Sequence, residues 1–235
     1  MGGPIFTPDN EPYLGLPELL AFDRMISTAM REQVAVASWT QQHKLSPLQE
    51  AAAQLVPSTC SIALSIRELI RQGYLVSAMI LLRPLVERVG TLTYLIEVPS
   101  GLDLWAQGWP YARRPKLTEL LSLMRGTAHA SSARGDSARP RRAAEDTAED
   151  DAFDQHRAIA ALFNELVHGG PNAAHAALIA LPDGRPAFTS SKDLGSPGRA
   201  ANIAAQAASY LLVLTARTVQ VFPEVKRTSS NGAGA

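Results

Sequence analysis

The sequence is poor in cysteine and has no net charge, and each shortage excludes a class of protein. Its 235 residues include one cysteine, Cys60, so the chain can form no internal disulfide and no zinc site built on cysteines. Lysine and arginine together number 22, as do aspartate and glutamate, so no overall charge attracts nucleic acid, an anionic membrane or an acidic substrate. Any binding that depends on charge must therefore be local.

The familiar catalytic and targeting motifs are also missing. No phosphate-binding glycine loop, serine elbow or zinc-protease motif occurs, and we expect no cofactor. A Glu-x-x-His unit occurs once, at Glu165 and His168, whereas a di-metal helical bundle needs two such units, so we expect no metal. The first residues lack the basic start and continuous apolar stretch of a signal peptide, which predicts a cytoplasmic protein.

What the sequence does contain is helical periodicity. Hydrophobic residues make up 46% of the chain and recur at helical spacing, which predicts an all-α fold, an antiparallel bundle of four or five long helices. Ser46, Pro47 and Gln49 predict a capped helix start. The run from Tyr74 to Val98 is apolar nearly all round, which predicts a central helix, and its charged residues argue against a membrane span. Other helices are expected over residues 18–43, 46–72, 116–124, 152–168 and 199–222, and residues 178–189 could form a small β-hairpin.

One stretch interrupts this pattern. Residues 126–150 contain no aromatic or branched aliphatic side chain, so they cannot bury enough apolar surface to order themselves, and we expect a disordered insert. Its arginines precede its acidic residues, so the insert could fold back on itself or recruit a protein partner. The expected organisation is a flexible N-terminus over 1–15, one bundle formed by 16–125 and 151–223, and a disordered tail over 224–235.

Two polar stripes on apolar helices form the best candidate site. Helical spacing places Arg83, Glu87 and Tyr94 on one face of the first helix and Arg157, Asn164 and His168 on one face of the second. Charges on a surrounded helix need partners, so we expect the stripes to meet. The candidate catalytic residues are His168, Arg83, Glu87 and Asn164, and the candidate binding residues are Tyr94, Trp105, Trp109 and Arg157. The structural alternatives are an ion pair that fixes helix register and a histidine that interacts with the carbonyl groups at its helix end.

The same segments carry a family resemblance. The segment 70–96, with its run LLRPLVERVGTLTYLIE at residues 81–97, resembles a bacterial family of helical proteins of unknown function when it is taken together with FNELVHGG. That family has a Leu-Leu-Arg-x-x-x-Glu helix before a helix ending in His-Gly or His-Pro. The resemblance covers about residues 45–222. Such proteins are similar to HEPN (higher eukaryotes and prokaryotes nucleotide-binding) bundles, many of which are dimeric, metal-independent ribonucleases in toxin or phage-defence systems. Their motif has four to six residues between an arginine and the histidine, and the positions where that arginine would stand here hold Ala161, Leu162 and Phe163.

Three functions follow from these observations. We expect a non-catalytic helical interaction or structural module that forms a homodimer, because the motif arginine is missing. The alternative is a HEPN-like ribonuclease in which Arg83 or Arg157 stabilises charge on the RNA phosphate and His168 acts as acid or base. A further alternative is a small-molecule or nucleotide pocket at the same stripes. Solvent access to His168 separates the hypotheses, because a catalytic imidazole must be reachable.

Overall fold

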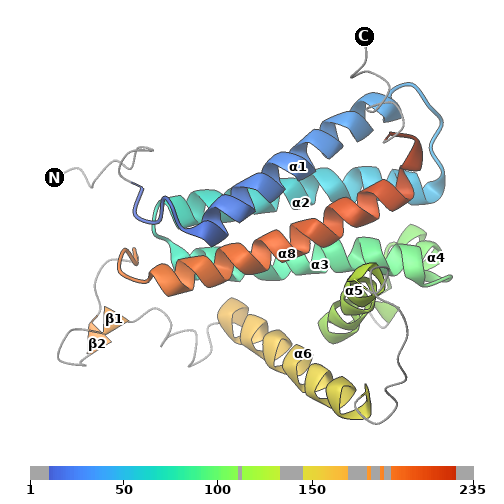
Figure 1. Ribbon diagram of the computed structural model, residues 1–235. Helices are drawn as coiled ribbons and strands as arrows, with labels where there is room; N and C mark the ends of the chain where they lie inside the picture. The colour runs from blue at the N-terminus through green and yellow to red at the C-terminus, as the bar shows by residue number, and fades with distance from the viewer. Residues whose placement is uncertain are drawn as a thin grey trace.

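The computed structural model describes residues 11–110, 113–132, 145–168, 179–180, 186–187 and 192–225, with the backbone alone for 126–132, 145–155 and the strands. The helices are α1 (Pro17–Thr40), α2 (Pro47–Arg71), α3 (Leu75–Glu97), α4 (Gly101–Ala106), α5 (Leu117–Ser132), α6 (Glu145–His168) and α8 (Pro197–Val221) (Figure 1). Two short strands, β1 (Ile179–Ala180) and β2 (Pro186–Ala187), pair antiparallel within the segment where a hairpin was considered. The all-α prediction is confirmed.

The start of α2 follows the predicted capping pattern. The Ser46 side chain accepts a hydrogen bond from the backbone N–H of Gln49, whose side chain in turn accepts one from the backbone N–H of Ser46. This reciprocal pair satisfies two N–H groups that the first helical turn would otherwise leave without partners. Pro47 occupies the first helical position, where no N–H is needed. The local sequence therefore defines the beginning of α2.

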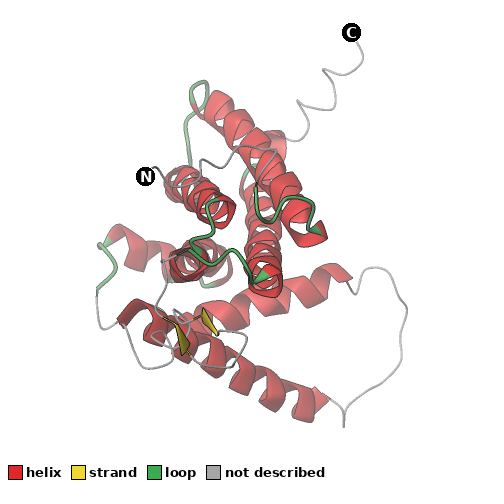
Figure 2. Ribbon diagram, turned by 90° about the vertical axis from the view of Figure 1, so that its left-hand side faces the viewer, coloured by secondary structure: helices red, strands yellow, loops and turns green. Residues whose placement is uncertain are grey.

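Helix α3 lies at the centre of the molecule. It packs against α2 and α8 and also against α4, α5 and α6, which Figure 1 labels. Figure 2 shows the same helices turned by 90°. Its side chains at Leu85, Val86, Val89 and Leu92 are fully buried, as its nearly continuous apolar surface predicts. Helix α1 packs against α8 and α2, so α1, α2, α3 and α8 share one core, and α5 and α6 pack on the α3 side of it.

The N-terminal turn is packed over residues 11–15, where the sequence predicts a flexible terminus. Tyr13 is 2% exposed, and its hydroxyl donates a hydrogen bond to the backbone oxygen of Asp193, just before α8. Asp193 also contacts the turn between α2 and α3, because its backbone N–H donates to the carbonyl of Gly73 at 2.8 Å. One aromatic side chain in a proline-rich terminus gives no sequence signal for contacts so distant along the chain. Residues 1–10 lie outside the described residues.

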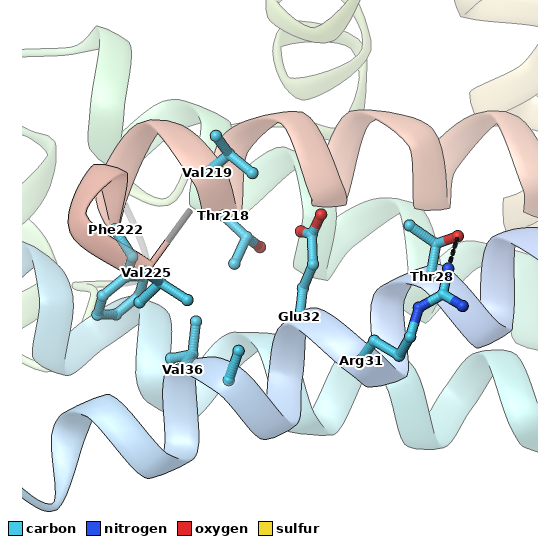
Figure 3. A pocket seen from close by; sticks show the side chains of 9 residues that line it. Thr28, Arg31, Glu32, Val36, Thr218, Val219, Phe222 and Val225 are labelled. Atoms are coloured by element: carbon cyan, nitrogen blue, oxygen red, sulfur yellow. Dashed lines mark hydrogen bonds between the residues drawn. The ribbon is translucent and has the colours of Figure 1, made fainter. Parts of the chain in front are cut away.

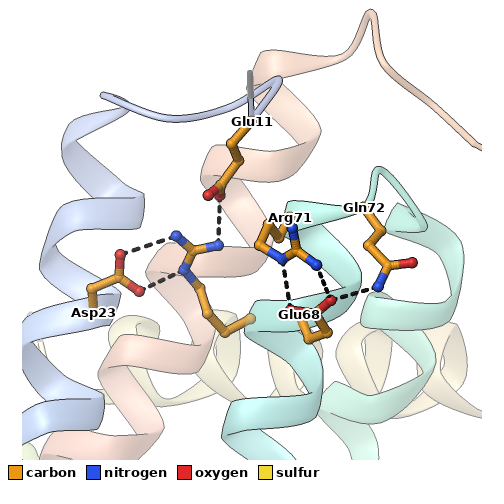
Figure 4. Close-up of polar contacts among 6 residues, drawn as sticks. Glu11, Asp23, Glu68, Arg71 and Gln72 are labelled. Carbon is orange, nitrogen blue, oxygen red and sulfur yellow. Dashed lines mark hydrogen bonds and ion pairs between the residues drawn. The ribbon is translucent and has the colours of Figure 1, made fainter. Parts of the chain in front are cut away.

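An arginine-centred ion-pair network joins this turn to the core (Figure 4). The Arg67 guanidinium of α2 donates to Glu11 at 2.6 Å and to Asp23 of α1 at 2.5 and 3.2 Å. Burial lowers the pKa of Arg67, but the hydrogen bonds that its guanidinium donates to Asp23 and Glu11 outweigh burial and raise the pKa above its ordinary value. The network therefore fixes three segments relative to one another through charge-assisted hydrogen bonds.

The boundaries of the expected insert differ from the sequence prediction. Helix α5 continues to Ser132 and α6 begins at Glu145, so both helices extend into the stretch 126–150. Alanine favours helix, and acidic residues stabilise a helix N-terminus, so these segments can be helical without apolar side chains. Residues 133–144 and the tail beyond residue 225 lie outside the described residues, so disorder there stays a prediction. Across the described part of the chain, no helix combines the length and apolarity needed to cross a membrane.

Candidate functional site

The two polar stripes meet where α6 crosses α3. The Arg83 guanidinium donates from Nη1 to Asn164 Oδ1 at 2.7 Å, and its Nε lies 3.1 Å from Glu87 Oε1. Arg83 and Glu87 are one helical turn apart on α3, so their contact is local, whereas Asn164 is 81 positions away in the sequence. We refer to Arg83, Glu87 and Asn164 as the α3–α6 cluster.

A second arginine extends the cluster toward solvent. Arg114, which lies before α5, places its Nη2 3.7 Å from Glu87 Oε2, and its side chain is 59% exposed. Glu87 thus interacts through its two carboxylate oxygens with two cations from different segments. An exposed pair at this distance contributes little to stability, because water and salt screen it. The α3–α6 cluster itself is the part that positions one helix on another.

The cluster is less buried than the sequence predicts. The side chains of Arg83 and Glu87 are 23% and 27% exposed, and Asn164 is an exposed residue. The apolar circumference of α3 suggested a charge pair inside the core, but the pair lies at the edge of the α3–α6 contact. The desolvation penalty that makes buried ion pairs costly is therefore reduced here.

His168 does not join the cluster. It is the last residue of α6, it is exposed, and no hydrogen bond or ion pair between described residues connects it to Arg83, Glu87 or Asn164. Asn164 lies one helical turn before it, so both belong to the same side of α6. Arg157 is also exposed on α6, nearer its start. His168 is therefore reachable from solvent, as a catalytic imidazole must be, yet no described side chain orients it.

The aromatic candidates lie elsewhere. Tyr94 and Trp109 form an edge-to-face pair with ring centroids 5.8 Å apart, and Trp105 and Trp109 form another at 5.4 Å. Tyr94 is eleven residues after Arg83 on α3, which is about 16 Å along the helix axis. The aromatic residues therefore cover the α3–α4 end of the molecule and are not brought together with the α3–α6 cluster.

The structure also has cavities away from these residues, and two of them are lined by more than one helix. One of about 330 Å³ lies between α1 and α8, where Glu32 and Thr218 face each other across an otherwise largely apolar lining (Figure 3). Another of about 220 Å³ lies between α5, α6 and α8 and includes Arg125 and His156. None of the eight residues proposed from the sequence lines either cavity. The sequence thus misses both.

A signal for His156 was nevertheless present in the sequence. His156, Ala160 and Phe163 follow spacing of four and three residues, and all are buried on the side of α6 that faces the rest of the protein. A histidine in the apolar stripe of a helix predicts a buried imidazole. Arg125 and Tyr210 carry no such signal, because only the fold brings α5 and α8 to α6. In the described part of the chain, no three histidine, cysteine, aspartate or glutamate residues are grouped to hold a metal ion.

Comparison with known proteins identifies one similarity. Residues 49–106 match a family of unknown function (DUF5677), a segment that runs from the first turn of α2 to the end of α4. The match includes Arg83 and Glu87 but not Asn164 or His168. No curated protein matches the chain, and neither does any solved structure. The similarity therefore covers the central helices and gives no activity, and likeness to HEPN bundles stays a hypothesis.

Proposed function

We propose that the protein is a non-catalytic helical interaction module, in which the α3–α6 cluster holds α6 in place. The hydrogen bond between Arg83 Nη1 and Asn164 Oδ1 is the observation that supports this proposal. Two of the five N–H donors of the guanidinium bond to Glu87 and Asn164 and orient its plane between α3 and α6, whereas donors that stabilise charge on a substrate are directed toward that substrate. The cluster is thus suited to positioning a helix.

We also propose that the module forms a homodimer through the outer face of α6. Helices α3 and α5 pack against one side of α6. Leu162 and Val167 lie on the remaining surface of α6, where they are 43% and 44% exposed. Exposed apolar side chains on a peripheral helix are a feature of self-association surfaces. Light scattering coupled to gel filtration should give a dimer for the native chain and a monomer for Leu162→Glu. Leu64→Glu, at an equally exposed leucine of α2, is the matched control and should stay dimeric.

A pair of substitutions tests the structural role of the cluster. Asn164→Ala should lower the free energy of unfolding by about 1 kcal/mol, because it removes a hydrogen bond to a charged group at a partly exposed site. His168→Ala should change it by less than about 0.5 kcal/mol, because His168 is exposed and makes no contact with the cluster. Urea unfolding followed by circular dichroism measures both. Equal losses for the two variants would contradict the assignment.

The second candidate function is a HEPN-like ribonuclease, and the exposure of His168 favours it. A reachable imidazole one turn from Asn164 meets the first requirement for acid or base catalysis, and a dimer through α6 would add a second copy of each residue. Purified protein incubated with RNA and a chelator distinguishes the functions. Cleavage by the native chain, lost in a folded His168→Ala variant, would establish the enzyme and overturn the proposal of a non-catalytic module.

A further inference from the structure

The cavity between α5, α6 and α8 combines an apolar wall with a few convergent polar groups. Leu121 and Met124 of α5, Ile159 of α6 and Val213 of α8 form the apolar part of its lining. The polar part consists of Arg125, His156, Ser209 and Tyr210. Small-molecule sites in proteins are mostly apolar concavities in which a few polar groups fix the orientation of the ligand. This cavity has that composition, and it is separate from the α3–α6 cluster.

The lining carries positive charge and no negative charge. Arg125 is half-buried and lines the cavity, and the lining includes no aspartate or glutamate. Among the described residues, no carboxylate forms an ion pair with Arg125. A guanidinium partly shielded from water interacts more strongly with an anion than an exposed one does, because the local dielectric is lower. The electrostatic preference of the cavity is therefore for an anion.

Hydrogen bonding defines the state of His156. The Ser122 hydroxyl donates to the carbonyl of Thr118 at 3.0 Å, and its oxygen lies 3.3 Å from His156 Nδ1. With the single hydroxyl hydrogen directed to Thr118, the Ser122 oxygen can accept a hydrogen bond from Nδ1–H of His156, and this assignment satisfies both contacts. Burial, together with the charge of Arg125, lowers the pKa of His156, so the imidazole is neutral near pH 7 and its Nε2 is an acceptor. Ser122 is thus not arranged as a nucleophile activated by this histidine.

Tyr210 supplies a neutral donor to the same cavity. Burial raises the pKa of its phenol, so the hydroxyl stays protonated under ordinary conditions. Ser209, the preceding residue of α8, donates its hydroxyl hydrogen to the carbonyl of Ala205 at 2.9 Å, so Tyr210 is the hydroxyl donor beside the apolar wall. An ionised carboxylate accepts hydrogen bonds from guanidinium and hydroxyl groups and donates none, so it matches these donors.

We propose that this cavity binds a small organic acid, with its carboxylate at Arg125 and a compact apolar group against Ile159, Met124 and Val213. A volume of about 220 Å³ corresponds to about seven water molecules in the liquid, at about 30 Å³ each, which suits a single ring or a short chain. This inference does not depend on the proposed function, because none of its residues belongs to the α3–α6 cluster.

Binding is linked to the protonation of His156. The groups that share the cavity with this imidazole are Arg125 from α5 and the hydroxyls of Ser209 and Tyr210 from α8, and the Ser122 hydroxyl bonds to its Nδ1. A bound carboxylate neutralises the field of Arg125, so the imidazole takes up a proton more readily. The pKa of His156 should therefore rise when an organic acid binds, and binding should become tighter as the pH falls through that pKa.

Benzoate is a suitable probe, with benzyl alcohol and benzylamine as neutral and cationic probes of similar size. The full chain, labelled with carbon-13, is titrated with each compound up to about 10 mM, tenfold above a millimolar dissociation constant. The His156 ring signal, assigned by its loss in His156→Gln, should shift saturably with benzoate and should not with the other two. Its titration midpoint should rise when benzoate is present. A missing saturable shift, or an equal response to benzyl alcohol, would overturn the proposal.

Two variants locate the site. Arg125→Met keeps an unbranched side chain but removes the charge, and should weaken benzoate binding by about tenfold or more. Arg113→Met is the matched control, because Arg113 is exposed and lies outside the cavity, and it should bind like the native chain. Ser209→Trp, at an exposed position on the rim, should block binding while circular dichroism shows a folded protein. Native affinity in Arg125→Met or in folded Ser209→Trp would contradict the assignment.

Discussion

At the scale of single residues, Arg67 shows how burial decides the importance of an ion pair. Its two partners differ in exposure, since the side chain of Glu11 is 4% exposed and that of Asp23 is 39% exposed. Water screens the Asp23 contact but hardly reaches the Glu11 contact. The contact that attaches the N-terminal turn is therefore the one most sensitive to loss of charge.

Neutralising these two carboxylates should have unequal effects. We expect Glu11→Gln to lower the free energy of unfolding by about 2 kcal/mol, because it weakens a charge-assisted hydrogen bond in a buried environment. Asp23→Asn should cost less than about 1 kcal/mol, because its contact is solvated. Each variant is the control for the other in urea unfolding. A larger loss in Asp23→Asn would show that the doubly bonded Asp23 contact dominates.

Glu68 gives the chain a stabilising contact that acid removes. Hydrogen bonds from the Arg71 and Gln72 side chains lower the pKa of Glu68 from 4.5 to about 2. Because the folded pKa lies below the unfolded one, the contribution is complete above about pH 4.5 and disappears as the pH falls toward 2. The Glu68 carboxyl carbon should titrate with a midpoint near 2 by nuclear magnetic resonance. Glu68→Gln should lose less stability than the native chain between these pH values, and a midpoint near 4.5 would contradict the contact.

The residue contacts differ in how far the sequence could predict them. Arg83 and Glu87 are four positions apart on a helix, so their pairing follows from helical geometry. The sequence predicts that the two stripes meet, with Asn164 and His168 as candidate partners of the ion pair, and Asn164 is the partner found. It does not predict that the contact lies at the edge of the core. The partners of Arg67 are 44 and 56 positions away and carry no local pattern, so only the packed structure shows them.

At the scale of elements, the contact between α3 and α5 depends on one missing side chain. Gly90 is buried in α3, and a Cβ atom built there would lie 2.7 Å from Cβ of Leu120 in α5. A glycine inside a helix costs about 1 kcal/mol relative to alanine, so close packing offsets a weaker helix here. Leu120 presents its Cβ, which cannot move without its backbone.

Substituting this glycine should reveal the balance between helix propensity and packing. Gly90→Ala should lower the free energy of unfolding by about 1 to 2 kcal/mol, because overpacking outweighs the gain in helix propensity. Gly198→Ala is the control, since a Cβ there, in the first turn of α8, meets no atom within 4 Å, and it should be neutral or stabilising. Thermal unfolding of both variants measures the difference. A stabilised Gly90→Ala would show that α5 can shift outward freely.

Helix boundaries were predictable where a specific terminal interaction exists. Ser46, Pro47 and Gln49 define the start of α2 through side-chain and backbone hydrogen bonds that involve only neighbouring residues. The end of α5 has no such signal, and its Ala- and Ser-containing continuation to Ser132 was taken from the sequence as part of a disordered insert. Apolar content predicts whether a segment is buried, and it does not by itself predict whether the segment is helical.

At the scale of the whole molecule, the helices differ in how many neighbouring helices pack against them. Helix α3 has neighbours on all sides, whereas α6 packs mainly on α5 and α3. The side chains that α6 buries among its described residues are His156, Ala160, Phe163 and Leu166. Local opening is easiest for the element that buries least apolar surface. Both the proposed dimer face and the acid-binding cavity include α6, so its local stability affects both proposals.

Hydrogen exchange should therefore show α6 opening before the core. In the native chain, we expect amides of residues 157–168 to exchange faster than those in the middle of α2 and α3, because α6 can detach without unfolding the α1, α2, α3 and α8 core. Phe163→Ala removes a side chain that is 2% exposed and should accelerate exchange throughout α6 while leaving the amides of α2 nearly unchanged. Leu64→Ala, at an exposed residue of α2, should leave exchange in α6 nearly unchanged. If Phe163→Ala accelerated exchange equally in α2 and α6, the two would unfold as one unit, and the protein would have no separately opening layer.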